Sequence, residues 1–277
     1  MLDRFLIEDI LINALKEDMN NGDITSDYLV DSSLNGKAII KSKETGVICG
    51  LDVAEMVFSI VDDSLIFSKL KVDGENVLSG EDIAVVEGSL KSILKAERVA
   101  LNFLQRMSGI ATKSRDISSI VEDLDVKIVD TRKTTPGLRV FEKYAVKMGG
   151  CYNHRFNLSD AVMIKDNHIE AVGSITRAVE ILRNKIPHTT KIEVEVKNIE
   201  ELKEALNAKA DIIMLDNMDS YIMKRAVEIA EGAAILEASG NMNKDNIRDA
   251  AETGVDIISV GELTHSFKSM DISLNII

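Results

Sequence analysis

Six short apolar runs in the second half of the chain alternate with stretches of helical spacing, and this alternation limits the fold more than any other feature. The runs lie at residues 126–130, 161–165, 192–196, 211–215, 233–237 and 256–260. Helix-like stretches follow several of them, at 174–185, 199–206 and 220–230. Such alternation favours parallel strands with right-handed crossovers, in either an α/β barrel or an open doubly wound sheet.

Polar residues or glycines occur at the end of nearly every run, and their placement favours the barrel. In chain order they are Arg132 and Lys133, Lys165, Glu195, Asp216, Ser239 and Gly240, and Gly261. In an α/β barrel, groups at the carboxyl ends of the strands converge over one mouth. No G-x-G-x-x-G motif follows an early strand, which disfavours a dinucleotide-binding sheet. Because only six strands are clear, we predict an incomplete α/β barrel.

The first 110 residues have a different pattern. Apolar spacing predicts helices at 5–19 and 90–107, and shorter β-like segments with glycine-containing turns lie between residues 37 and 87. We therefore predict an α/β protein with two domains, at residues 1–110 and 111–277. The final segment, 267–277, contains DISLNII and could add a strand to either domain.

The net charge excludes several kinds of partner. Lys and Arg number 33 and Asp and Glu number 46, which gives −13 at pH 7. So acidic a surface is unsuited to nucleic acid or to an anionic membrane, and no apolar run approaches the about 20 residues that span a bilayer. The N-terminus lacks the basic start of a signal peptide, and two cysteines cannot form a disulfide framework. We therefore expect a cytoplasmic protein.

One segment departs from this acidic balance. Residues 131–165, here called the basic segment, contain seven Lys and Arg and two acids, a local net charge of +5. Lys143 and Lys147 lie in a helix-like stretch, where we expect a solvated charged face. Arg132, Lys133 and Lys165 lie at strand ends and predict an anionic ligand, because Arg matches a carboxylate with two hydrogen bonds and Lys suits phosphate.

Two carboxylates, Glu195 and Asp216, are expected at the same mouth as these cations. They could hold a divalent metal together with phosphate oxygens, stabilise a cationic transition state, or simply neutralise the lysines. The Ser239-Gly240 pair and Gly261 could present backbone N–H groups to a phosphate.

Several strings along the chain resemble one known family. They are ERVALNFLQRMSGIAT (97–112), DTRKTTPGLRVFEKYAVKMGG (130–150), HRFNLSDAVMIKDNHI (154–169), EVEV (193–196), MLDN (214–217), LEASG (236–240) and ETGVDIISVGELTHS (252–266). In this order they are similar to quinolinate phosphoribosyltransferase, also called nicotinate-nucleotide pyrophosphorylase. KEDMNNGDITS (16–26) resembles the N-terminal segment of the same family, so the resemblance covers essentially the whole chain.

The resemblance implies a reaction and an architecture. Members of this family convert quinolinate and phosphoribosyl pyrophosphate, with Mg²⁺, to nicotinate mononucleotide, pyrophosphate and carbon dioxide in NAD biosynthesis. The resemblance also implies an N-terminal α/β sandwich, an incomplete α/β barrel, and a homodimer with active sites shared between subunits. It leaves assembly into higher oligomers open.

The resemblance also implies which residues bind quinolinate. From the residues alone, the adjacent His154 and Arg155 could bind one carboxylate together, and His154 could equally be structural. The resemblance implies that the two quinolinate carboxylates are held by Arg132, His154, Arg155 and Lys165. It implies that Arg98 reaches the active site of the neighbouring subunit.

Other residues are implied to bind the phosphoribosyl donor. Lys133 is expected to meet this donor, and Glu195 and Asp216 to face its ribose hydroxyls and the metal. These three are the expected catalytic residues. The 5′-phosphate is expected to lie against Ser239, Gly240 and Gly261.

Two alternatives remain from the residues themselves. The first is a Schiff-base lyase or isomerase with Lys165 as the nucleophile, which explains a lysine at a strand end but not the cations around it. The second is a non-catalytic anion-binding barrel, which explains the basic segment but not the carboxylates Glu195 and Asp216.

Overall fold

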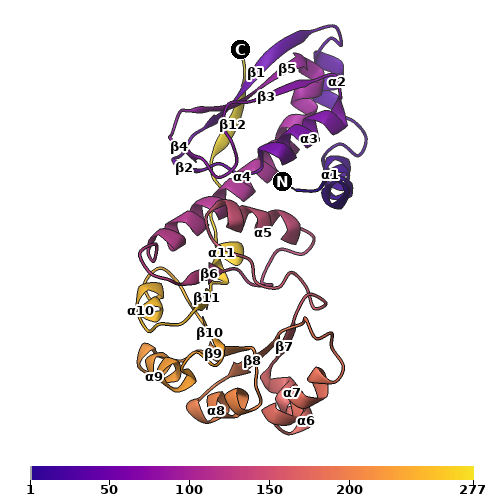
Figure 1. Ribbon diagram of the computed structural model, residues 1–277. Coiled ribbons are helices and arrows are strands. Elements are labelled where there is room, and N and C mark those ends of the chain that lie inside the picture. The colour runs from indigo at the N-terminus through magenta and orange to yellow at the C-terminus, as the bar shows by residue number, and fades with distance from the viewer. Residues whose placement is uncertain (1) are drawn as a thin grey trace. The chain divides into compact units, whose positions relative to one another are not determined.

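The structure is a computed structural model that describes residues 2–277 (Figure 1). The described residues form two compact units, and neither is one continuous stretch. The first contains the residues up to Arg115, Thr134–Gly150 and Phe267–Ile277, and the second contains Asp116–Lys133 and Cys151–Ser266. This division departs from a single boundary at residue 110, because one helix and the last strand of the second half join the first unit.

The first unit is built on an antiparallel sheet with strand order β12-β1-β5-β3. Its strands are β1 (Asn35–Ser42), β3 (Ile66–Lys69), β5 (Asp82–Ser89) and β12 (Ile272–Ile276), and a small second sheet pairs β2 (Gly46–Val47) with β4 (Asn76–Val77). The helices are α1 (Arg4–Asp18), α2 (Ile24–Leu29), α3 (Leu51–Val61), α4 (Leu90–Ser119) and α5 (Arg139–Met148). The predicted combination of helices and a sheet in this half is confirmed.

The last strand settles which unit the C-terminal segment joins. β12 pairs antiparallel with β1, from Ser42 opposite Ile272 to Ala38 opposite Ile276. Ile272 is buried, as is Met270 just before the strand. The sequence left open which domain the C-terminal segment joins, and the structure shows that it adds a strand to the sheet of the first unit.

Helix α3 was missed in the sequence, where its residues fall within the β-like stretch. It begins after Gly50, whose φ of 106° lies in the left-handed region. The backbone N–H groups of Gly50 and Leu51 both donate to Asp73 Oδ1, at 3.0 Å each. The carboxylate that accepts from the N–H groups at the start of this helix thus lies more than twenty residues away in sequence. The residues next to the helix therefore contain no capping signal that predicts where it begins.

Helix α4 continues well past its predicted end at residue 107. Two other segments of the chain approach its backbone closely. A Cβ built on Gly109 would lie 2.2 Å from the carbonyl oxygen of Lys268, and one on Gly149 would lie 2.3 Å from that of Ala111. Both glycines are therefore required by close approach. These contacts bring α5 and the C-terminal segment against α4, which explains why both belong to the first unit.

Helix α5 packs on α4 through a buried ion pair and a ring contact. Glu142 is fully buried and accepts from Arg106 Nη2 at 2.5 Å, and its other oxygen accepts from the backbone of Thr135 at 3.1 Å. The rings of Phe103 and Phe141 lie 4.9 Å apart. The expectation of a solvated charged face is wrong for Lys143, which is 2% exposed because α5 is covered on this side, whereas Lys147 is exposed.

The second unit contains the parallel sheet that the apolar runs predict. Its described strands have the order β6-β11-β10-β9-β8-β7, and every adjacent pair is parallel. They are β6 (Lys127–Val129), β7 (Val162–Ile164), β8 (Ile192–Val196), β9 (Ile212–Asp216), β10 (Ile235–Ser239) and β11 (Ile257–Ser259), so all six predicted runs form strands. β6 and β7 remain at the two edges of this sheet, which confirms an incomplete α/β barrel.

Helices connect these strands, and three of them begin at local capping residues. They are α6 (Asp166–Val172), α7 (Ile175–Arg183), α8 (Ile199–Asn207), α9 (Ser220–Ala230), α10 (Ile247–Ala251) and α11 (Glu262–His265). The side chains of Ser174, Asn198 and Asp219 each accept from a backbone N–H in the first turn of α7, α8 and α9. Because these caps are local, the sequence predicted the three helices closely. Among residues 2–277, every helix is too short or too polar to cross a bilayer.

Removal of the Glu142 carboxylate tests the role of the α4–α5 ion pair. Glu142→Ala leaves the Arg106 guanidinium without this acceptor in a half-buried position, so we expect a loss of about 2–3 kcal/mol in the free energy of unfolding. Glu8→Ala removes an exposed pair with Arg4 and should cost under about 0.5 kcal/mol. Urea unfolding measures both, and equal losses would contradict the assignment.

Candidate active site

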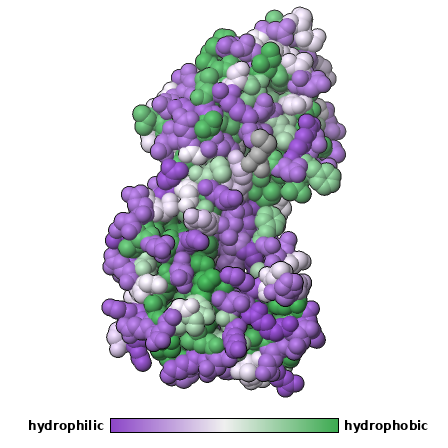
Figure 2. Space-filling model, viewed as in Figure 1, coloured by the Kyte–Doolittle hydropathy of each residue, from purple (hydrophilic) through white to green (hydrophobic). Residues whose placement is uncertain are grey.

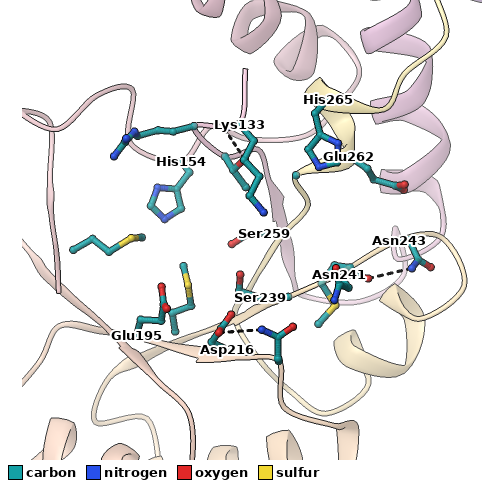
Figure 3. Close-up of a pocket in the computed structure, with 18 of the residues that line it drawn as sticks. Lys133, His154, Glu195, Asp216, Ser239, Asn241, Asn243, Ser259, Glu262 and His265 are labelled. Atoms are coloured by element: carbon teal, nitrogen blue, oxygen red, sulfur yellow. Dashed lines mark hydrogen bonds between the residues drawn. The ribbon is translucent and has the colours of Figure 1, made fainter. Parts of the chain in front are cut away.

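A cavity of about 680 Å³ lies at the carboxyl ends of the strands of the second unit. Figure 3 shows side chains from several strand ends pointing into it. Ten of the eleven predicted site residues line it, namely Arg132, Lys133, His154, Arg155, Lys165, Glu195, Asp216, Ser239, Gly240 and Gly261. The eleventh, Arg98, lies on α4 in the first unit, where it is exposed. The parallel sheet thus brings together residues that are up to 129 positions apart.

The His154-Arg155 segment reaches the cavity through a pairing that the sequence did not reveal. Tyr152 forms an isolated parallel bridge with Val129, the last residue of β6. Just beyond it, fully buried Asp130 accepts from the backbone of His154 at 2.9 Å and from Asn153 Nδ2 at 2.6 Å. This short extended segment therefore delivers two further groups to the same end of the sheet as the six strands.

The basic side chains crowd together in this cavity. Burial, and next the charge of Arg132, lower the pKa of Arg155 below its ordinary value. Arg155 Nη1 donates to the carbonyl oxygen of Ala161 at 2.8 Å, which aims the guanidinium. Two neighbouring guanidinium groups repel each other, so an anion between them would be strongly favoured.

The carboxylates of the cavity are partnered. Lys165 Nζ lies 2.5 Å from Glu195 Oε2, and the Glu195 side chain is 12% exposed. Asn217 Nδ2 donates to Asp216 Oδ2 at 3.0 Å. Figure 3 shows Glu195 and Asp216 on the side of the cavity opposite Lys133.

The turn after β9 depends on Asn217 and Gly240. Asn217 adopts a left-handed φ of 54°, and its backbone N–H donates to the carbonyl oxygen of Ser239 at 2.9 Å. A Cβ on Gly240, whose φ is 102°, would lie 2.3 Å from Asn217 Oδ1. Gly240 is therefore required both by its backbone conformation and by space. Asn217, Asn241 and Asn243 also line the cavity, and none of them was among the predicted site residues.

A buried polar cluster lies beside the cavity. Glu193 and Glu237 are 3% and 1% exposed, and His154 Nε2 lies 3.2 Å from Glu193 Oε2 and 3.6 Å from Glu237 Oε2. Ser259 Oγ donates to Glu237. Burial, and next the neighbouring Glu193 carboxylate, raise the pKa of Glu237 to about 7. Both glutamates were missed, although Glu193 and Glu195 alternate with valines and so share one face of β8.

Comparison with known proteins identifies the family. The model for the quinolinate phosphoribosyl transferase C-terminal domain matches residues 110–275, and the model for the N-terminal domain matches residues 23–108. The chain belongs to this family. The resemblance that the motifs indicated is therefore confirmed along nearly the whole length of the chain.

Relatives and solved structures agree with this assignment. The probable nicotinate-nucleotide pyrophosphorylases (carboxylating) of Synechocystis sp. and Bacillus subtilis are 44% and 42% identical, each over 98% of this chain and 93% of the relative. The crystal structure of the Francisella tularensis nicotinate-nucleotide pyrophosphorylase is 39% identical, with a TM-score of 0.96 over 100% of this chain and 98% of that one. A Streptococcus pyogenes NadC crystal structure is 42% identical, with a TM-score of 0.96 over 100% and 99%.

The raised pKa of Glu237 predicts a pH-dependent stability difference. Between its ordinary value of 4.5 and about 7, folded Glu237 holds a proton that the unfolded chain releases. The free energy of unfolding therefore falls as the pH rises through this window. Glu237→Gln cannot ionise, so its stability relative to the native protein should rise as the pH increases from 4.5 to about 7 and level off above that. Urea unfolding at pH 5, 6, 7 and 8 checks this, and a constant difference would contradict it.

Proposed function

We propose that the protein transfers the phosphoribosyl group of phosphoribosyl pyrophosphate to quinolinate, with loss of carbon dioxide, to give nicotinate mononucleotide and pyrophosphate. The step belongs to NAD biosynthesis. The observation that carries this proposal is one cavity lined by Arg132, Lys133, Arg155 and Lys165 in a chain of net charge −13. Both substrates are polyanions, so cations concentrated in one place suit them.

Quinolinate fits the part of the cavity with the guanidinium groups. Arg132 and Arg155 present planar forks that match carboxylates, and Lys165 supplies a further positive charge. With both carboxylates held, the pyridine nitrogen can be aimed at the anomeric carbon of the ribose. Its lone pair forms the new C–N bond as the C–O bond to pyrophosphate breaks, so no nucleophile from the protein is needed.

The donor fits the side with the carboxylates. Departure of pyrophosphate builds positive charge on the ribose, and we propose that Glu195 and Asp216 stabilise it. Lys133 is proposed to meet the negative charge of the leaving pyrophosphate. The 5′-phosphate is proposed to bind at the strand ends that carry Ser239, Gly240 and Gly261.

The residues present suit Mg²⁺. Glu195 and Asp216 both line the cavity, and carboxylate oxygens are ligands that this ion prefers. We propose that these two residues hold it together with oxygens of the donor. When bound, the ion would offset negative charge on the pyrophosphate.

The Lys165–Glu195 ion pair disfavours the Schiff-base alternative. Lys165 Nζ is held by Glu195 Oε2 at 2.5 Å, so the amine that would have to attack a carbonyl is already engaged in an ion pair. A non-catalytic anion-binding barrel gains no support from this arrangement, because carboxylates in the same cavity weaken anion binding unless they serve the chemistry.

A homodimer with shared active sites is part of the proposal. The first unit exposes several large apolar side chains, among them Phe5, Leu6, Ile24, Tyr28 and Leu29. Exposed apolar groups of this size favour association with another surface. Arg98, exposed on α4, is the residue proposed to enter the partner's site. We propose a cytoplasmic location, because two cysteines are too few for the disulfide framework typical of small secreted proteins.

One assay tests the proposed reaction. Purified protein mixed with quinolinate, phosphoribosyl pyrophosphate and Mg²⁺ should form nicotinate mononucleotide, and removal of the metal with EDTA should abolish product. Arg132→Ala should lower kcat/KM about 100-fold or more because a bidentate carboxylate contact is lost. Lys147→Ala, also in the basic segment but exposed on α5, is the matched control and should keep its activity. No product, or equal activity with nicotinate in place of quinolinate, would refute the proposal.

Mixed dimers test whether Arg98 acts across subunits. Arg98→Ala and Lys165→Ala should each be inactive alone, because each lacks one cation of every site. After subunit exchange, one site of each mixed dimer would have both native residues, so we expect recovery of up to about a quarter of native activity for random pairing. Exchange is verified by differently tagged chains. No recovery after verified exchange would place Arg98 outside the partner's site.

A further inference from the structure

Both ring nitrogens of His154 have partners within the protein. The backbone N–H of Arg155 donates to His154 Nδ1 at 2.7 Å. On the other side of the ring, Nε2 lies 3.2 Å and 3.4 Å from the two carboxylate oxygens of Glu193. A nitrogen that accepts a hydrogen bond carries no proton, so the ring proton lies on Nε2 and is donated to Glu193.

This tautomer argues against a metal at the buried cluster. His154, Glu193 and Glu237 each offer an atom within 4.8 Å of the others, a spacing that a cation could bridge. A metal on Nε2 would require that nitrogen to lose its proton while Nδ1 continues to accept from Arg155. The ring would then be an anion, so the geometry favours a chain of hydrogen bonds instead.

The chain of contacts runs from the buried interior to the binding cations. Ser259 donates to Glu237, which lies against the same ring nitrogen as Glu193. Through Nδ1, the ring holds the peptide of Arg155. Asp130 holds the preceding peptide through the N–H of His154, at 2.9 Å. The backbone that carries the Arg155 guanidinium is thus fixed on both sides of His154.

We propose that Glu193 is a positioning residue for recognition of the substrate's carboxylates. It orients His154, and His154 in turn fixes Arg155, while Glu193 itself does not touch the substrate. In this arrangement His154 acts through the backbone, because neither of its ring nitrogens is available to a substrate carboxylate. The inference rests on the proposed function and refines it, since it concerns the quinolinate half of the cavity alone.

Two substitutions of Glu193 separate orientation from charge. Glu193→Ala removes the acceptor for Nε2, so the KM for quinolinate should rise about tenfold, while the KM for phosphoribosyl pyrophosphate should stay within about twofold. Glu193→Gln keeps an oxygen that can accept from Nε2, so the KM for quinolinate should return to within about threefold of the native value. Glu204→Ala is the matched control: this half-buried glutamate accepts from the backbone N–H of Thr176 at 2.9 Å, away from the cavity, and both KM values should be unchanged.

Nitrogen NMR gives a readout that does not depend on activity. The chain has four histidines, and His154→Gln assigns the signals of His154 by their loss. In ¹⁵N-histidine-labelled protein, His154 should show a protonated Nε2 and an unprotonated Nδ1. Glu193→Gln should keep this pattern, and Glu193→Ala should lose it.

Several outcomes would overturn the inference. They are equal rises in both KM values for Glu193→Ala, no rise at all, a Glu193→Gln variant as impaired as Glu193→Ala, or a proton on Nδ1 in the native protein. If Glu193→Ala does not fold by circular dichroism, Glu193→Asp replaces it, since its shorter carboxylate cannot reach Nε2. A native protein that forms no nicotinate mononucleotide would refute the proposed function, whereas the NMR result still decides the Glu193–His154 contact.

Discussion

Parallel hydrogen bonding among β6 to β11 is the constraint on which the site depends. Because neighbouring strands run in the same direction, their carboxyl ends meet along one edge, and residues from Arg132 to Gly261 line one cavity there. The sheet is open between β6 and β7, and the bridge from Val129 to Tyr152 partly extends it. That small addition matters chemically, since it carries His154 and Arg155 to the same edge.

Charge segregation follows from this arrangement. A chain of net charge −13 concentrates Arg132, Lys133, Arg155 and Lys165 at one cavity, although like charges oppose such crowding. Glu195 pairs with Lys165, and buried Glu193 lies near enough to stabilise the Arg155 charge. The carboxylates therefore offset part of the positive charge of this cavity. The net negative charge of the chain, which disfavours binding of polyanions, describes the protein surface as a whole. This cavity is an exception because cations are concentrated in it.

The first unit contains segments from both sides of residue 110, so a single boundary in the sequence does not separate the two units. Helix α5 packs on α4 through Arg106 and Glu142, and β12 completes the antiparallel sheet beside β1. Each contact joins residues that are far apart in sequence, so no local composition change marks it. Close backbone approach at Gly109 and Gly149 is equally invisible before the fold is known, because a glycine in a helix or at its end has several explanations.

The sequence by itself determined the six strands, the helices with local caps, the α/β class and eight residues at strand ends that line the cavity, because period, capping and strand-end placement are local properties. The roles of His154 and Arg155 were implied by the family resemblance. The family resemblance rested on motifs that are likewise contiguous in sequence. Only the tertiary structure decided that α3 begins at a cap from Asp73, that Lys143 is buried, and that Glu193 and Glu237 meet His154. These contacts depend on which side chains, distant in sequence, are buried together. The residue pattern of one strand does not specify which side chains the neighbouring strands place beside it.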